Sequence, residues 1–94
     1  KNSVVRMSRV YQGNATSAVM RLGEIFREAV RDSAVKVIVA HNHPSGDLTP
    51  SPEDIAATRE VVRAGKLLDI EVLDHLIIGP RGHLSLKAQG LGFD

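Results

Sequence analysis

The chain has 94 residues with a formal net charge of +1, and 43% of the residues are hydrophobic. The near-neutral charge and the scarcity of aromatic residues argue against a surface dedicated to nucleic acid, although a local basic patch fits the same numbers. The absence of cysteine excludes disulfides and thiolate ligands, so a transition metal here requires His and carboxylate side chains.

These bulk properties predict one compact domain over residues 1–94. No apolar run approaches the roughly 20 residues that span a bilayer, and no signal-peptide pattern opens the chain, so we expect a cytoplasmic protein. The chain begins at Lys1 and runs directly into strand-like sequence, from which we expect a fragment whose first strand is incomplete.

The first third of the chain predicts two short strands and a helix. Residues 4–11 are rich in Val and predict a strand, and residues 15–19 predict a returning strand that completes a hairpin. Residues 21–32 predict a helix with one apolar stripe. The stripe comprises Leu22, Ile25, Phe26, Ala29 and Val30.

The remainder of the chain alternates between strands and helices. Residues 34–40 are a β-branched apolar run typical of a buried strand, and a loop rich in Pro, Gly and Ser follows it. Residues 52–68 predict a second helix, residues 70–78 a strand, and residues 83–86 a short final strand. The apolar side of the second helix comprises Ile55, Thr58, Val61, Val62 and Leu68. This alternation predicts an α/β fold around a mixed sheet.

A His-x-His pair follows the strand predicted over residues 34–40. On an extended chain, residues i and i+2 point to the same face, so the imidazoles of His41 and His43 can reach one ion. Asp54 lies in the first turn of the next helix, where its carboxylate can complete a His₂Asp set. Three protein ligands with one open position are typical of a catalytic zinc site, which activates water near neutral pH.

The segment around Asp54 also fits a simple helix start. Ser51 suits the N-cap, Pro52 suits the first helical position, and Asp54 suits the third position of a capping box. The spacing alone therefore leaves metal binding and helix capping open as alternatives.

The run from His41 to Asp54 resembles the JAMM motif in its RadC form, in which H-x-H-P is followed by six residues and then S-x-x-D. This sequence matches the motif at every one of those positions, and the segments 24–26 and 73–79 resemble further RadC signatures. The resemblance covers about residues 1–90 and implies a bacterial RadC-like JAB/MPN domain of the UPF0758 type. The implied fold is an α-β-α sandwich of the cytidine-deaminase-like type, with helices on the faces of a mixed sheet.

The resemblance also implies a site and a reaction. His41, His43 and Asp54 would bind one Zn²⁺ per chain, and Ser51 would support the tetrahedral intermediate as an oxyanion donor. The implied chemistry is that of a metallopeptidase or isopeptidase, in which zinc-bound water attacks an amide carbonyl of an unknown peptide or protein substrate. The general-base glutamate of the family precedes the domain's first strand, so we expect it to lie outside these residues.

Glu24 is the candidate substitute for that missing base. At about 100° per residue, Glu24 lies roughly 200° from Leu22, and the apolar stripe is centred near Leu22 and Phe26. We therefore expect Glu24 to lie on a solvated helix face, and it reaches a cleft only if the helix begins later.

Two further groups of polar residues are candidates for a functional role. Asp74 and His75 adjoin in a predicted strand and point to opposite faces, so they cannot pair with each other. His75 either faces the metal side or satisfies a hydrogen bond in the core, and we expect the structural role. Arg59, Arg63 and Lys66 follow helical spacing, which is typical of a solvated face.

Three functions fit these features. The leading hypothesis is a zinc-dependent hydrolase of amide bonds. The alternatives are a DNA-repair-associated protein that binds or processes nucleic acid, as the family name implies, and a non-catalytic MPN-type interaction scaffold. The intact ligand set favours the hydrolase over the scaffold. An incomplete first strand can expose a sheet edge, so a homodimer is a further expectation, and no membrane partner is expected.

Overall fold

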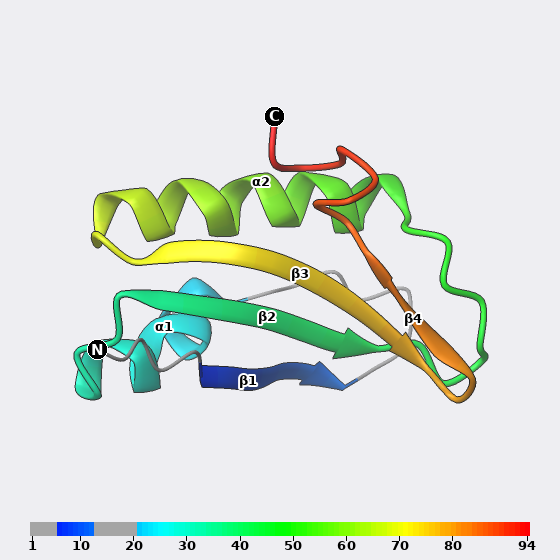
Figure 1. Ribbon diagram of the computed structural model, residues 1–94, viewed down its shortest axis with the longest axis horizontal. Helices are drawn as coiled ribbons and strands as arrows, with labels where there is room; N and C mark the ends of the chain where they lie inside the picture. Colours follow the sequence, from blue (N-terminus) through cyan, green and yellow to red (C-terminus); the bar gives the residue numbers. More distant parts are fainter. Residues whose placement is uncertain (1–5, 13–20) are drawn as a thin grey trace.

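The computed structural model describes residues 6–12 and 21–94, which form a four-stranded mixed sheet and two helices (Figure 1). The elements in chain order are β1 (Arg6–Gln12), α1 (Leu22–Arg31), β2 (Lys36–Asn42), α2 (Pro52–Leu67), β3 (Glu71–Gly79) and β4 (Gly82–Ser85). The strands lie in the order β1-β2-β3-β4, with the first three parallel and β4 antiparallel to β3. The predicted α/β class and mixed sheet are confirmed.

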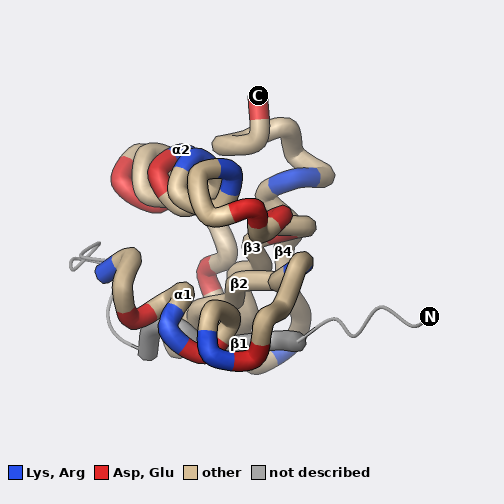
Figure 2. The backbone as a smooth tube through the Cα atoms, turned by 90° about the vertical axis from the view of Figure 1, so that its left-hand side faces the viewer, with Lys and Arg blue, Asp and Glu red and all other residues tan. Residues whose placement is uncertain are grey.

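Both helices pack on the same face of the sheet (Figure 2). Two successive parallel crossovers that step in the same direction place their helices on one side of the strands. The core between the helices and the sheet comprises Ile25, Phe26, Ala29, Val37, Val39, Val61, Ile70 and Val72. The helical layer expected on the opposite face of a sandwich is not among the elements described in residues 6–12 and 21–94.

The N-terminal prediction is confirmed only in part. The strand predicted over residues 4–11 corresponds to β1, which pairs in parallel with β2. The returning strand predicted over residues 15–19 lies outside the described residues. The hairpin that would join these two strands therefore stays a prediction.

The ends of both helices are more exposed than the sequence pattern predicts. Val30 is 56% exposed and Leu68 is 47% exposed, so neither belongs to the core, although both lie in the predicted apolar stripes. Val30 belongs to the last turn of α1, and Leu68 is the C-cap residue of α2. The buried stripes are shorter than predicted because the C-terminal ends of the helices do not pack against the sheet.

β3 contains an irregularity that decides which of its side chains face the helices. Between the pairs Val37–Val72 and Ile38–Asp74, the β2–β3 register shifts by one residue. Because side chains alternate along a strand, an extra residue reverses the facing of every side chain that follows it. His75 is thereby opposite Val39, a residue of the core beneath the helices.

Charged residues lie on the outer surfaces of the helices. Figure 2 shows Lys and Arg interspersed with Asp and Glu along α1 and α2. Arg63 forms an ion pair with Glu60 at 2.7 Å, and Arg59 forms one with Asp94 at 3.5 Å. The solvated face predicted for Arg59, Arg63 and Lys66 is confirmed. In the described part of the chain, neither helix has the length and hydrophobicity that crossing a membrane requires.

Candidate metal centre

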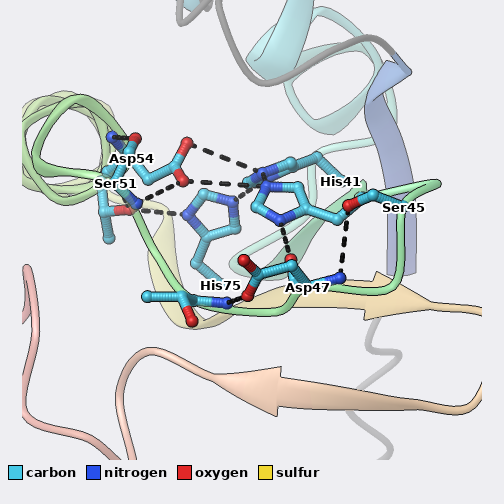
Figure 3. A network of polar contacts seen from close by, with 9 residues as sticks. His41, Ser45, Asp47, Ser51, Asp54 and His75 are labelled. Carbon is cyan, nitrogen blue, oxygen red and sulfur yellow. Dashed lines mark hydrogen bonds and ion pairs between the residues drawn. The ribbon is translucent and has the colours of Figure 1, made fainter.

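The two predicted histidine ligands lie where β2 ends. The sequence places the end of this strand before His41, but β2 continues to Asn42 because His41 and Asn42 pair with Ile77 and Ile78 of β3. The backbone N–H of His43 then donates to the carbonyl oxygen of Ile78 at 2.8 Å. The backbone therefore stays extended through the pair, and both imidazoles point to the same side, as predicted. Figure 3 shows the His41 ring directed toward Asp54.

Asp54 approaches these histidines from the first turn of α2. The Nε2 atoms of His41 and His43 are 3.0 Å apart. Oδ1 of Asp54 lies 3.7 Å from Nε2 of His41, and Oδ2 lies 3.8 Å from Nε2 of His43. All three residues are buried, with 5%, 8% and 8% of their surfaces exposed. Their ligand atoms lie within 4.8 Å of one another, which makes this a group that could hold a metal ion.

The hydrogen bond on the far side of the His43 ring fixes which nitrogen faces the group. Nδ1 of His43 lies 2.7 Å from the backbone carbonyl oxygen of Asp47. A carbonyl oxygen only accepts, so Nδ1 carries the proton. In the neutral ring, Nε2 then presents a lone pair toward His41 and Asp54. This arrangement, in which a backbone carbonyl orients the ring, is common behind metal-binding histidines.

Asp54 completes a capping box and also joins the candidate ligand group. The Ser51 hydroxyl oxygen accepts from the backbone N–H of Asp54 at 3.0 Å, and Oδ2 of Asp54 accepts from the backbone N–H of Ser51 at 2.8 Å. These bonds satisfy backbone groups at the helix start and hold the carboxylate in place. The two alternatives that the spacing left open are therefore compatible in one geometry.

His75 lies next to the group, and the structural role expected for it is one of two roles that its contacts allow. The extra residue in β3 turns His75 toward the helices, and its Nε2 lies 2.9 Å from Nδ1 of His41. Its Nδ1 lies 2.7 Å from Oγ1 of Thr58 in α2, a residue predicted only as part of an apolar stripe. Both open alternatives for His75 are thus realised together, because it is hydrogen-bonded in the core and also faces the metal side.

Burial keeps these rings uncharged near neutral pH. Burial, with a smaller contribution from the neighbouring His41 ring, lowers the pKa of His75 from 6.5 to about 4. Burial also lowers the pKa of His41, against an opposing effect of the Asp54 carboxylate. A metal ion binds the neutral form of imidazole, so a lowered pKa reduces competition from protons.

The other polar candidates do not join the group. The Glu24 side chain is 63% exposed and forms a 3.8 Å ion pair with Arg21, which agrees with a solvated helix face. Asp74 accepts from the Ser85 hydroxyl at 2.6 Å and from the backbone N–H of Lys87 at 3.2 Å. Asp74 therefore holds the end of β4 and the segment that follows it by hydrogen bonds, and it does not pair with the ring of His75.

Several known bacterial proteins have sequences similar to this chain. Residues 1–91 match the family described as RadC-like JAB domain. A UPF0758 protein of Chloroflexus aggregans is 56% identical over 94 residues, which are 100% of this chain and 41% of that protein. A UPF0758 protein of Roseiflexus sp. is 52% identical over 93 residues, covering 99% of this chain and 40% of the relative. A UPF0758 protein of Clostridium perfringens is 47% identical over 91 residues, covering 97% of this chain and 40% of the relative. The chain thus spans about two-fifths of the length of these curated relatives.

Proposed function

The chain belongs to the family of RadC-like JAB domains, and from this premise we propose that it is the zinc-binding hydrolase part of its protein, acting on an amide bond. The observation that carries the proposal is the buried meeting of His41, His43 and Asp54 at the end of β2. A peptide or protein is the proposed class of substrate.

The donor set and its spacing fit zinc. Bonds of about 2.0–2.2 Å at tetrahedral angles place ligand atoms about 3.3–3.6 Å apart. The two Nε2 atoms are 3.0 Å apart, and each lies 3.7 or 3.8 Å from a different oxygen of Asp54. With one ligand atom from each residue the set lies within 4.8 Å, so a small movement of the carboxylate would bring one oxygen into this range for both nitrogens. Two imidazoles and one carboxylate also leave one tetrahedral position open, as in catalytic zinc sites.

The chain's own residues would bind, orient and shield the ion. His41, His43 and Asp54 would hold it, while the Asp47 carbonyl and the Ser51 backbone N–H fix the His43 ring and the Asp54 carboxylate. When bound there, zinc supplies Lewis-acid activation of water and of a carbonyl group. The burial of the ligands limits competition from bulk solvent and strengthens electrostatic interactions within the site.

Ser51 is the proposed oxyanion donor. Its oxygen accepts the capping hydrogen bond from Asp54, which leaves the hydroxyl proton available for donation. We assign no general base among the described residues, since Glu24 is exposed and paired with Arg21. A hydrolysis assay should therefore include added imidazole as an external base.

The first experiment measures zinc per chain by elemental analysis, in the native chain and in His43→Ala, after purification without added metal and again after reloading. About one zinc per native chain is expected, with loss in the variant, because two remaining ligands bind zinc weakly. A native chain that takes up no zinc on reloading would overturn the proposal.

The second measurement tests hydrolysis of a peptide mixture by the zinc-loaded chain, with and without imidazole. His43→Ala should abolish zinc-dependent cleavage. Ser51→Asp keeps a side chain that can cap α2 but removes the hydroxyl donor, so its stability should hold while cleavage falls by about 10²–10³-fold. Cleavage that is equally fast in His43→Ala would remove the metal from the proposed reaction.

A further inference from the structure

A buried set of hydrogen bonds leads away from the candidate ligands into α2. His41 Nδ1 lies 2.9 Å from Nε2 of His75, whose Nδ1 lies 2.7 Å from Oγ1 of Thr58. The Thr58 hydroxyl is also 2.7 Å from the backbone carbonyl oxygen of Asp54, to which it donates. Thr58 and His75 are 0% and 1% exposed, so bulk water does not compete for these contacts. Figure 3 shows the His75 ring beside the ligand group.

The carbonyl at the end of this set gives the hydrogen bonds a direction. Because the Asp54 carbonyl can only accept, the one hydroxyl proton of Thr58 points toward it, and Oγ1 accepts from Nδ1–H of His75. A neutral imidazole carries one N–H, so Nε2 of His75 is the acceptor for Nδ1–H of His41. Nε2 of His41 then presents its lone pair on the side of His43 and Asp54. It meets the lone pair of His43 Nε2 at 3.0 Å, so these two nitrogens share no proton and a bound cation would lie between them.

The opposite choice of donors and acceptors would place a proton on Nε2 of His41 and remove the lone pair that faces His43 and Asp54. With the proton on Nε2 of His41, Nδ1 of His41 would have to accept from His75, and His75 from Thr58. Thr58 would then have no proton for its 2.7 Å contact with the Asp54 carbonyl oxygen. The orientation of the Thr58 hydroxyl in α2 therefore determines which nitrogen of His41 in β2 carries the lone pair.

From this geometry we propose that Thr58 and His75 are positioning residues that hold His41 in the Nδ1–H tautomer and so aim its Nε2 lone pair at a metal ion. The proposal rests on the proposed metal function and extends it, because neither residue belongs to the ligand group. Residues that orient a metal-binding histidine in this way typically contribute about 10–100-fold to metal affinity.

The test compares zinc affinity, by competition with a chromogenic chelator, in the native chain, Thr58→Val, His75→Leu and His75→Gln. Thr58→Val keeps the side-chain shape and removes the hydroxyl, so affinity should fall about 10-fold. His75→Leu removes the acceptor for Nδ1–H of His41 and should lower affinity by at least as much. His75→Gln offers an amide oxygen as acceptor and should recover part of the loss.

Two controls separate positioning from general stability. Val61→Ala removes core volume from α2 without touching the hydrogen bonds, and Leu67→Ala changes an exposed residue at the end of α2. Both should bind zinc like the native chain. His75→Leu removes a hydrogen-bond partner from each of His41 and Thr58, so its metal-free stability should also fall. Its zinc affinity is therefore compared with that of Val61→Ala, which loses stability but keeps the hydrogen bonds, and a merely structural role for His75 would leave the zinc affinity of both variants unchanged.

Ring nitrogen NMR reads the tautomers directly. The chain has four histidines, so long-range ¹H–¹⁵N spectra of the ¹⁵N-labelled, zinc-loaded chain can be assigned from single variants. The proposal requires the proton on Nδ1 in both His41 and His75. A proton on Nε2 of His75, or unchanged zinc affinity in Thr58→Val and His75→Leu, overturns the positioning role and leaves the zinc site standing. A native chain that binds no zinc overturns both.

Discussion

A neutral histidine buried between two hydrogen-bonding partners makes stability depend on pH. His75 is 1% exposed, and burial together with the nearby His41 ring lowers its pKa from 6.5 to about 4. The unfolded chain therefore binds a proton at this residue at a higher pH than the folded chain does. The contribution of His75 to stability is complete above pH 6.5 and is lost as the pH falls toward 4.

We predict that this effect is measurable in the chain freed of metal by a chelator. Between pH 7 and pH 4.5, protonation of His75 should lower the free energy of unfolding by about 2–3 kcal/mol. Urea denaturation at both pH values measures the difference. His75→Leu should reduce it, whereas His83→Gln, which changes an exposed histidine, should not. An equal loss of stability in native chain and His75→Leu would contradict the assignment to His75.

At the scale of single elements, α2 must end close to the start of β3. The backbone N–H of Ile70 donates to the carbonyl oxygen of Gly65 at 2.8 Å. A Cβ atom on Gly65 would lie 2.4 Å from the carbonyl oxygen of Ile70 and 3.0 Å from a methyl group of Val72. Helix propensity alone treats this glycine as a weakness of about 1 kcal/mol, but the turn into β3 requires the missing side chain.

Gly65→Ala should therefore destabilise the chain, although alanine favours helices. Crowding of the Ile70 backbone should cost about 1–3 kcal/mol of unfolding free energy, since the nearest atom belongs to backbone and cannot rotate away. Gly23→Ala in α1 is the matched substitution, because among the described residues no atom beyond its chain neighbours and its own helix backbone lies within 4 Å of an added Cβ, and it should stabilise by up to about 1 kcal/mol. Thermal unfolding of both variants measures whether each substitution raises or lowers the stability. Stabilisation by Gly65→Ala would show that the turn into β3 can relax and would contradict the prediction.

Over the whole molecule, the candidate metal centre joins the sheet to the helix layer. Its candidate ligands come from the end of β2 and from α2, and the hydrogen bond from His41 to His75 connects them to β3. An ion held there would cross-link the sheet to the helix layer only in the folded state. Metal binding should for that reason raise the free energy of unfolding of the whole domain.

Zinc should raise the free energy of unfolding of the native chain by about 2.7 kcal/mol when its free concentration is 100 times the dissociation constant. The measurement is urea denaturation at increasing buffered zinc, reversed by a chelator. His43→Ala should show no such increase, and magnesium should have little effect because it prefers oxygen ligands. Equal stabilisation of native chain and His43→Ala would mean that zinc acts elsewhere on the surface.

The ligand set is the part of the site that the sequence predicts, because its geometry is local. His41 and His43 share a face through the two-residue period of an extended chain, and Asp54 is placed by the capping box that starts α2. The helices and strands of the described residues match the predicted ranges within about two residues for the same reason, since periodicity and turn residues act over short distances.

Tertiary structure decided the surroundings of that set. By simple alternation from Val72, His75 would face away from the helices, and only the register shift beside Leu73 turns it toward His41. Thr58 lies in a predicted apolar stripe, but its hydroxyl contacts His75 across the core. The placement of both helices on one face likewise depends on strand order. Register and strand order arise from contacts between distant segments, and the periodicity of one segment carries no information about its neighbour.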